Sequence, residues 1–277
     1  MPQLEWPGPD ALRLCYVETG TGDPLVFVHG AFSDQRVWAP QLDGLSGHAR
    51  CIALTMRHFG ASSALPTGSY SMATHAADLA AFIDRLAPGG AHVVASSYGA
   101  AVALACALAG PGRCLSLCLN EPALPSLLTT PAEQQVARAA RRELAPVAAA
   151  STAGDLRGAV EAFCDWTAFA GAFATLSPAL KAMFHDNAHT LALHLVSPPP
   201  TITPADLLAL RLPVTYVLGS RSNAYFRAIV QAAQRHTPGS ELHVVDGTHH
   251  GTPFERPQAF DAIVVDHLRR ARAASGA

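Results

Sequence analysis

The sequence predicts an α/β protein, with a mainly parallel sheet covered by helices on both faces. Three observations support this. Short apolar runs alternate with helical patterns through most of the chain, which is typical of strands joined by helices. The alternation is interrupted once, from about 123 to 210, where only helical patterns occur. The length of 277 residues, 49% hydrophobic and 14% charged, suits one large domain with an insertion.

The strands and helices of the core are expected where the apolar period changes. The apolar runs that read as strands are 12–20, 24–30, 51–56, 92–96, 114–122, 212–220 and 241–247. The segments with helical spacing between and after them are 70–86, 98–109, 225–236 and 255–274. In a parallel sheet built this way, ligands gather at the carboxyl ends of the strands.

The helical segment in the middle of the chain is interpreted as a cap. We expect a core made of 1–122 and 211–277, with 123–210 covering the mouth of the site. Aromatic residues are concentrated in this segment: Phe163, Trp166, Phe169, Phe173 and Phe184. Such a stripe is more often core than ligand site, but a cap also has a face toward the cleft. Trp166 is assigned to the substrate pocket on this basis.

Composition excludes several classes of function. The net charge is −2 without a basic cluster, which argues against nucleic acid. No apolar run is long enough to span a bilayer, so no membrane association is expected. The six cysteines form no CxxC pair and are expected as buried thiols in a cytoplasmic protein. His185 and His189 lie four apart but lack a third ligand in register, so neither metal nor cofactor is predicted. A homodimer is left open.

A serine stands at the junction of a strand and a helix, within 95–99. Ala95 and Gly99 lie two positions either side of Ser97, and the tight turn of a nucleophile elbow requires small residues there. A frame centred on Ser96 would place a valine and a tyrosine at those positions. Ser97 is therefore the candidate nucleophile. The alternative is that Ser97 only caps an ordinary helix.

Two other segments suit the same chemistry. The helix start after the serine directs the Tyr98 N–H toward developing negative charge. The loop after the buried strand in "VFVHGAF" offers the N–H of Ala31 as a second oxyanion donor. Late in the chain, "GTHHGTPFERPQAF" places histidines between the last strand and the last helix, from where one can reach Ser97.

Together these segments resemble the α/β-hydrolase fold family over nearly the full chain. The resemblance is carried, in order, by "VFVHGAF", "RHFGASS", "VVASSYGAA", "LPVTYVLGS" and "GTHHGTPFERPQAF". It implies a mainly parallel eight-stranded sheet with a helical cap inserted after strand 6. It also implies that His250, five residues before Glu255, is the catalytic base. His249 is the lesser alternative and is assigned, with Gly30 and Phe32, to the substrate pocket.

The triad acid departs from the usual family pattern. Ser222 stands where the family carries aspartate, and neither it nor the following asparagine can be charged. We therefore expect the Ser222 side chain to contribute little. Glu121, at the end of the strand after the elbow helix, is assigned as the acid, a position that haloalkane dehalogenases and hydrolases resembling zearalenone lactonase also use. Glu121 could instead be a surface carboxylate, with Asp246 or Asp186 as the acid.

The sequence thus predicts a cofactor-free serine hydrolase with a Ser-His-Glu triad. Its substrate is expected to be an apolar small-molecule carboxylic ester or lactone, with an aromatic or macrocyclic acyl group among the options. Two alternatives stay open: hydrolysis of a C–C bond in a diketone or ring-fission product, and a non-hydrolytic family member that binds a ligand or cyclises a substrate.

Overall fold

A single sheet forms the centre of the molecule. The structure, a computed structural model, describes residues 3–5, 13–60, 62, 69–198 and 201–275. The strands are β1 (Gln3–Glu5), β2 (Arg13–Thr19), β3 (Pro24–Val28), β4 (Arg50–Leu54), β5 (Ala91–Ser96), β6 (Cys114–Asn120), β7 (Val214–Gly219) and β8 (Glu241–Val245). They lie in the order β1-β2-β4-β3-β5-β6-β7-β8. The predicted mainly parallel eight-stranded sheet is confirmed.

The only antiparallel pairs in the described sheet are at one edge. β2 runs antiparallel to β4, and β1 adds to the outer side of β2, also antiparallel. The six strands from β4 to β8 are all parallel, so their carboxyl ends meet at one edge. The seven apolar runs in the sequence became β2 to β8. β1 has only three residues, too few to show a period.

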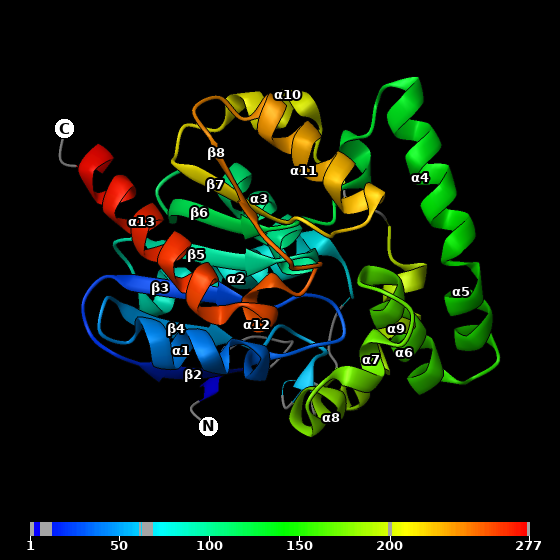
Figure 1. Ribbon diagram of the computed structural model, residues 1–277. Helices are drawn as coiled ribbons and strands as arrows, with labels where there is room; N and C mark the ends of the chain where they lie inside the picture. The colour runs from blue at the N-terminus through cyan, green and yellow to red at the C-terminus, as the bar shows by residue number, and fades with distance from the viewer. Residues whose placement is uncertain (1–2, 6–12, 61, 63–68, 199–200, 276–277) are drawn as a thin grey trace.

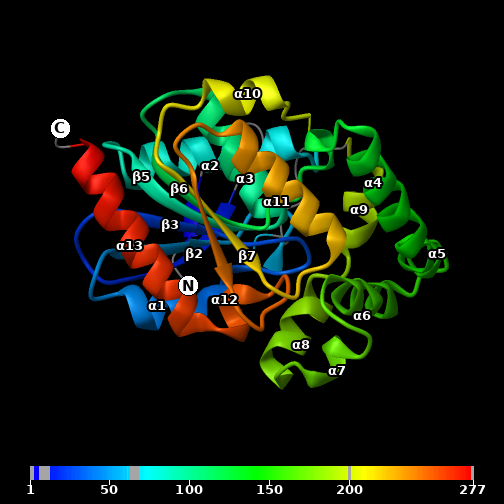
Figure 2. The ribbon, with the colours of Figure 1, turned by 45° about the horizontal axis from the view of Figure 1, so that its top comes forward.

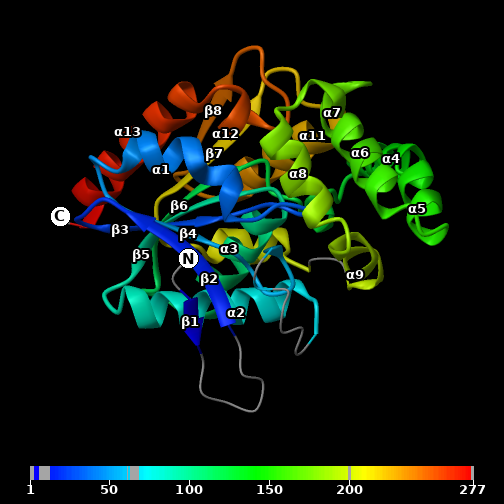
Figure 3. The ribbon, with the colours of Figure 1, turned by 90° about the horizontal axis from the view of Figure 1, so that it is seen from below.

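Helices cover both faces of the sheet, as Figure 3 shows from below. One face carries α1 (Ala39–Leu45) and α13 (Pro257–Ser275), with the short α12 (Thr252–Glu255) packed on α13. The other carries α2 (Met72–Leu86), α3 (Tyr98–Ala109) and α11 (Ala224–His236). Short 3₁₀ helices span Gln35–Trp38 and Pro125–Leu127.

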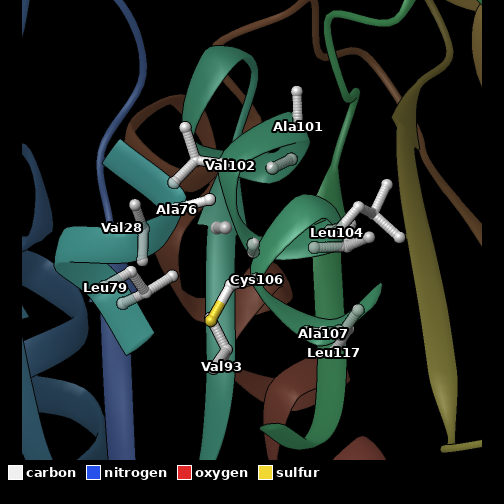
Figure 4. Packing of buried hydrophobic residues seen from close by; sticks show 14 of the residues in the cluster. Val28, Ala76, Leu79, Val93, Ala101, Val102, Leu104, Cys106, Ala107 and Leu117 are labelled. Atoms are coloured by element: carbon white, nitrogen blue, oxygen red, sulfur yellow. The ribbon is translucent and has the colours of Figure 1, made fainter. Parts of the chain in front are cut away.

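The helix after the candidate nucleophile, α3, lies in the middle of the core. Its residues are apolar on every side, which is the pattern of a helix buried all round. Figure 4 shows Cys106 of α3 beside Val93 of β5, with Val102 at the preceding turn of α3 and Leu79 of α2 nearby. All four side chains are 0% exposed. The start of α3, and with it the serine, is therefore held by close packing.

The segment between β6 and β7 is helical wherever it is described, apart from loops. Its helices are α4 (Pro131–Glu143), α5 (Ala145–Thr152), α6 (Leu156–Thr167), α7 (Ala172–Thr175), α8 (Pro178–Asp186), α9 (Thr190–Val196) and α10 (Pro204–Ala209). Helices α4 to α9 gather at one end of the sheet (Figures 1 and 2). Helix α10 packs against α11 instead. The division into a core of 1–122 and 211–277 and a cap of 123–210 stays a prediction.

A buried carboxylate joins this helical segment to the core. Asp34 accepts hydrogen bonds from the Arg36 guanidinium at 2.7 Å and from the Asn187 amide at 2.8 Å. Arg36 also pairs with Asp186 at the end of α8, at 2.8 Å. The Asn187 side chain in turn accepts from the Gly60 N–H at 2.7 Å. Helix α8 is thereby fixed to the loops that follow β3 and β4.

Two predictions from composition can be compared directly with the structure. The six cysteines are all free and buried, as expected. Among the described residues, none of the helices combines the length and apolar character that a membrane span requires.

Candidate active site

Ser97 lies at a strained turn between β5 and α3. Its φ of 55° and ψ of −119° are unusual for a residue with a side chain, and such strain costs about 1–3 kcal/mol and is concentrated at functional sites. A Cβ on Gly99 would lie 2.2 Å from the His29 carbonyl oxygen, so only glycine fits there. The Ser97 side chain makes no capping hydrogen bond to α3. The interpretation of Ser97 as an ordinary helix cap is therefore not supported.

The backbone of this turn is tied to the end of β6. The Ser97 N–H donates to the Asn120 carbonyl at 2.8 Å, and the Ser97 carbonyl accepts from the Ala123 N–H at 3.1 Å. The residue is 8% exposed. Within the described part of the chain its hydroxyl has no hydrogen-bond partner, so it is free to meet a ligand.

Two backbone N–H groups beside Ser97 are available as donors. Tyr98 is the first residue of α3, and Ala31 follows β3 by three residues. Neither N–H donates to another described residue. The loop of Ala31 approaches the turn closely, because a Cβ on Gly30 would lie 3.3 Å from the Ser97 Cβ. The next residue, Phe32, also has a positive φ, of 59°. The geometry suits an anion bound between the two loops.

A buried glutamate contacts the predicted histidine. Glu121 Oε2 lies 2.7 Å from His250 Nδ1, and Glu121 is 0% exposed. Its other oxygen accepts from the Gly219 N–H at 2.8 Å and from the Ser222 hydroxyl. Glu121 has a φ of 42°, so the chain turns sharply to direct its carboxylate inward. Because both oxygens are hydrogen-bonded, the buried negative charge is compensated.

The other acids that the sequence left open have different partners. Asp246 accepts a hydrogen bond from the Ser220 hydroxyl at 3.1 Å, and Asp186 pairs with Arg36. Glu121 is thus the carboxylate that His250 contacts among the described residues, and it is not at the surface. The expectation that Ser222 contributes little does not fit the structure, because its hydroxyl hydrogen-bonds to this carboxylate.

Other contacts fix the orientation of His250. A carboxylate only accepts, so Nδ1 carries the proton and Nε2 is left as the basic nitrogen. The Phe226 ring stacks on the imidazole at a centroid distance of 3.8 Å and an interplanar angle of 20°. The Asn120 amide donates to the His250 carbonyl at 3.0 Å. Sequence reasoning missed Phe226, Asn120 and Ser222. Only Ser222 carried a signal, since it occupies the position of the family's acid.

Two cavities meet at Ser97, and we name them chamber A and chamber B. Chamber A, of about 240 Å³, also contains His250, and chamber B, of about 290 Å³, lies on the side of Tyr98. Ala31, Phe32 and Phe163 line both chambers with Ser97. Both linings are dominated by apolar side chains, many of them from the helices between β6 and β7. A ligand attacked by Ser97 could therefore extend into either chamber.

The predicted pocket residues are divided between the chambers. Gly30 and His249 line chamber A, Trp166 lines chamber B, and Phe32 lines both. The His249 ring packs against Phe169 at 5.2 Å, and its Nδ1 lies 3.3 Å from the Glu255 carboxylate. His249 is thus paired with a different acid from the one that contacts His250.

One group of side chains in the described structure has metal-ligand spacing. Glu241 and His243 of β8 and Asp266 of α13 bring their ligand atoms within 4.8 Å of one another. The guanidinium of Arg270 forms ion pairs with both Glu241 and Asp266. These residues line neither chamber, and an internal cation already balances the acids. The chemistry available at Ser97 is that of a serine hydroxyl, an imidazole and a carboxylate.

Comparison with known proteins adds a family to this geometry. A family model described as "Alpha/beta hydrolase family" matches residues 25–263. The dihydrolipoyllysine-residue acetyltransferase component of the acetoin cleaving system of Cupriavidus necator is 35% identical over 144 residues. This match covers 50% of the present chain and 37% of that protein. A haloalkane dehalogenase of Agrobacterium fabrum is 31% identical over 116 residues, covering 42% and 38% of the two chains.

The curated relatives therefore match over less than half of their length, whereas solved structures match throughout. The structure of Est816, described as an N-acyl homoserine lactone degrading enzyme, has a TM-score of 0.76. It covers 95% of this chain and 98% of its own at 23% identity. At that identity the likeness establishes the fold alone.

Proposed function

Because the chain belongs to the α/β hydrolase family, we propose that it is a serine hydrolase that cleaves a carboxylic ester or lactone of a small apolar substrate. The observation that carries the proposal is the buried Glu121–His250 pair, whose histidine lines the same chamber as Ser97. A serine hydroxyl that shares a cavity with a carboxylate-paired histidine suits nucleophilic acyl transfer.

The proposed reaction begins at the serine hydroxyl. His250 Nε2 takes the proton of Ser97 Oγ as the oxygen attacks the ester carbonyl. The Glu121 carboxylate stabilises the imidazolium that forms and keeps the ring in the required tautomer. The proton then passes to the leaving alcohol, and an acyl-serine remains. A water molecule, deprotonated by His250, releases the acid and restores the hydroxyl.

The negative charge of each tetrahedral intermediate falls on the former carbonyl oxygen. The free N–H groups of Ala31 and Tyr98 are the proposed donors to it, and the start of α3 adds its dipole. Loss of one such donor typically lowers the rate by ~100-fold or more. The proposal needs no metal or cofactor.

The two chambers support an apolar substrate. Phe163, Phe169, Phe173 and Phe184 line chamber A, and chamber B is bordered by Trp166 and leucines. An ester has two arms that leave the carbonyl in different directions, and a cavity on each side of the serine suits such a shape. A lactone would need to bend across the same point.

Covalent labelling tests the proposal. A fluorophosphonate should add to Ser97, as measured by peptide mass, and Ser97→Ala should take up no label and lose at least ~10³-fold in turnover of p-nitrophenyl esters. Ser46→Ala is the control, because the Ser46 hydroxyl only bonds the Asp43 carbonyl far from the chambers. An unlabelled wild-type protein would favour a ligand-binding or cyclase role. Turnover of diketones but not of esters or lactones would replace the proposal with C–C bond hydrolysis.

A further inference from the structure

We propose that chamber B recognises an uncharged hydrogen-bond acceptor on the substrate, such as a ketone or ether oxygen, through Nε2 of His194. The inference rests on the proposed function, since it concerns which ester or lactone the same site accepts. It makes His194 a specificity-determining residue on one side of Ser97.

The polar side chains of chamber B are mostly used within the protein. The Tyr98 hydroxyl lies 2.7 Å from His75 Nδ1, and the Trp166 N–H donates to Glu143 at 2.9 Å. The Ser197 hydroxyl donates to the Tyr70 carbonyl at 3.1 Å. Within the described structure, two side-chain groups of this lining besides the Ser97 hydroxyl lack a partner: His194 Nε2 and the Tyr225 hydroxyl. A ligand in chamber B can therefore hydrogen-bond to only a few side-chain groups of the described lining.

The His194 ring is held in place on several sides. Its Nδ1 lies 3.2 Å from the Tyr70 hydroxyl. The ring also meets Tyr98 edge-on at 5.1 Å and Phe32 edge-on at 5.8 Å. Tyr98 and Phe32 both border Ser97, so the imidazole is positioned by the residues that form the reaction site. A donor fixed in this way loses little freedom when it binds a ligand.

The remaining nitrogen of His194 is open to the chamber. Nε2 has no hydrogen-bond partner among the described residues, yet it is not one of the fully buried unpaired atoms. His194 lines chamber B, and the proposed site has Nε2 facing this chamber. In the proposed arrangement the Tyr70 hydroxyl, the stronger acid of the two groups, donates to Nδ1, and the ring proton is therefore on Nε2. The substrate must then supply the acceptor.

The acceptor should be uncharged. Burial lowers the pKa of His194 to about 4, so its ring is neutral near pH 7. The described lining of chamber B also contains no lysine or arginine. A carboxylate would be desolvated there without a compensating cation, which is unfavourable. A ketone or ether oxygen loses much less hydration and gains the Nε2–H donor.

Chamber A presents different polar side chains in the part described. Two of its hydroxyl groups donate to nearby backbone carbonyls, Ser33 to Gly30 at 3.0 Å and Thr167 to Cys164 at 2.8 Å, and the Ser96 hydroxyl accepts from the Asn120 amide at 3.1 Å. Its second histidine, His249, is paired with Glu255. The two chambers therefore differ in chemistry, and the polar arm of the substrate belongs in chamber B.

The test uses two matched pairs of esters. Each pair consists of an apolar ester and the same ester with one CH₂ group replaced by a ketone. The replaced CH₂ lies in the acyl arm in the first pair and in the alcohol arm in the second. We expect the wild type to favour the ketone member of one pair by about three- to tenfold in kcat/KM, as one neutral hydrogen bond provides. His194→Phe should abolish this preference, while Tyr70→Phe should reduce it. His185→Phe is the matched control, because His185 pairs with Glu161 and lines neither chamber.

Three outcomes would overturn the inference. The wild type could show no preference for the ketone ester in either pair. The preference could persist in His194→Phe, or it could be removed only by Tyr225→Phe. Should His194→Phe fail to fold, His194→Gln keeps an N–H donor and must retain the preference, whereas Tyr70→Phe must still reduce it.

Binding separates this inference from the hydrolase proposal. The same ester pairs are titrated calorimetrically into Ser97→Ala and into Ser97→Ala with His194→Phe, so no turnover is needed. A ketone preference that depends on His194, in a protein that hydrolyses none of the esters, would refute the hydrolase but keep the recognition site. Equal binding of both members would refute the recognition site alone.

Discussion

At the scale of single residues, the acid of the site depends on a serine that carries no charge. Ser222 donates to the oxygen of Glu121 that does not face His250, and it is 4% exposed. A hydrogen bond to a buried carboxylate is worth about 1.5–3 kcal/mol. At the position where the family carries aspartate, this chain thus has a hydroxyl that hydrogen-bonds to the Glu121 oxygen not facing His250.

We expect Ser222→Ala to lower kcat about tenfold, because Glu121 loses one of the donors that orient it. Glu121→Gln should lower kcat by about 10³-fold or more, since the imidazolium then has no anion. Steady-state kinetics on an ester measures both, with Ser222→Thr expected to retain most activity. Ser240→Ala is the control, because its hydroxyl bonds the Thr237 carbonyl outside both chambers. Equal losses in Ser222→Ala and Glu121→Gln would contradict our choice of acid.

The sequence indicated residues with a local signature and missed those defined by distant contacts. Ser97 was recognisable from small neighbours at fixed spacing, and Glu121 from its place at the end of an apolar run. Phe226 and Asn120 had no such signature. Each contacts His250 from a different element, and a single sequence does not show which distant residues meet. Ser222 was noticed only as a missing acid.

At the scale of elements, the turn from β5 into α3 depends on one close backbone approach. Above Gly99 lie the carbonyl oxygens of His29 and Val28, at 2.2 and 2.6 Å from a Cβ placed there. Neither can move without shifting β3 and the loop that carries Ala31. The same contact that forms the elbow therefore brings the second oxyanion donor to it.

We expect Gly99→Ala to destabilise the protein by about 3 kcal/mol, because the added methyl group meets backbone rather than a flexible side chain. Urea unfolding followed by circular dichroism measures this. Gly89→Ala is the matched control, since a Cβ there meets nothing within 4 Å. A Gly99→Ala variant with an unchanged midpoint would show that the turn is not held as tightly as described.

Element boundaries were less predictable than element types. The run 114–122 reads as one strand, but β6 ends at Asn120 because Glu121 adopts a positive φ. Likewise the run 241–247 ends two residues early, at Val245. In both cases the chain leaves the sheet at a residue of the site or at the loop that carries one. The spacing of apolar residues along the sequence does not indicate where such turns begin.

At the scale of the whole molecule, several buried histidines are neutral parts of the core. His29 Nε2 accepts from the Met56 N–H at 3.0 Å, and its Nδ1 bonds the Gly30 carbonyl at 2.8 Å. Two others make comparable contacts: His75 with Tyr98, and His267 with Thr215 at 2.8 Å. Burial lowers the pKa of His29 and His267 to about 4 and that of His75 to about 3.

These histidines predict that the protein loses stability in mild acid. Unfolded histidine titrates near 6.5, so between about pH 6.5 and 4 the unfolded chain binds more protons, and the free energy of unfolding falls with pH. Each of the three contributes a loss of about 2 kcal/mol at pH 5. Asp261, whose pKa burial raises to about 6, acts in the opposite direction but is a single group.

The urea midpoint should therefore be clearly lower at pH 5 than at pH 7.5. His267→Gln should reduce this difference, whereas His48→Gln, at an exposed position, should not. Equal midpoints at the two pH values would mean that these histidines are not held neutral by the fold.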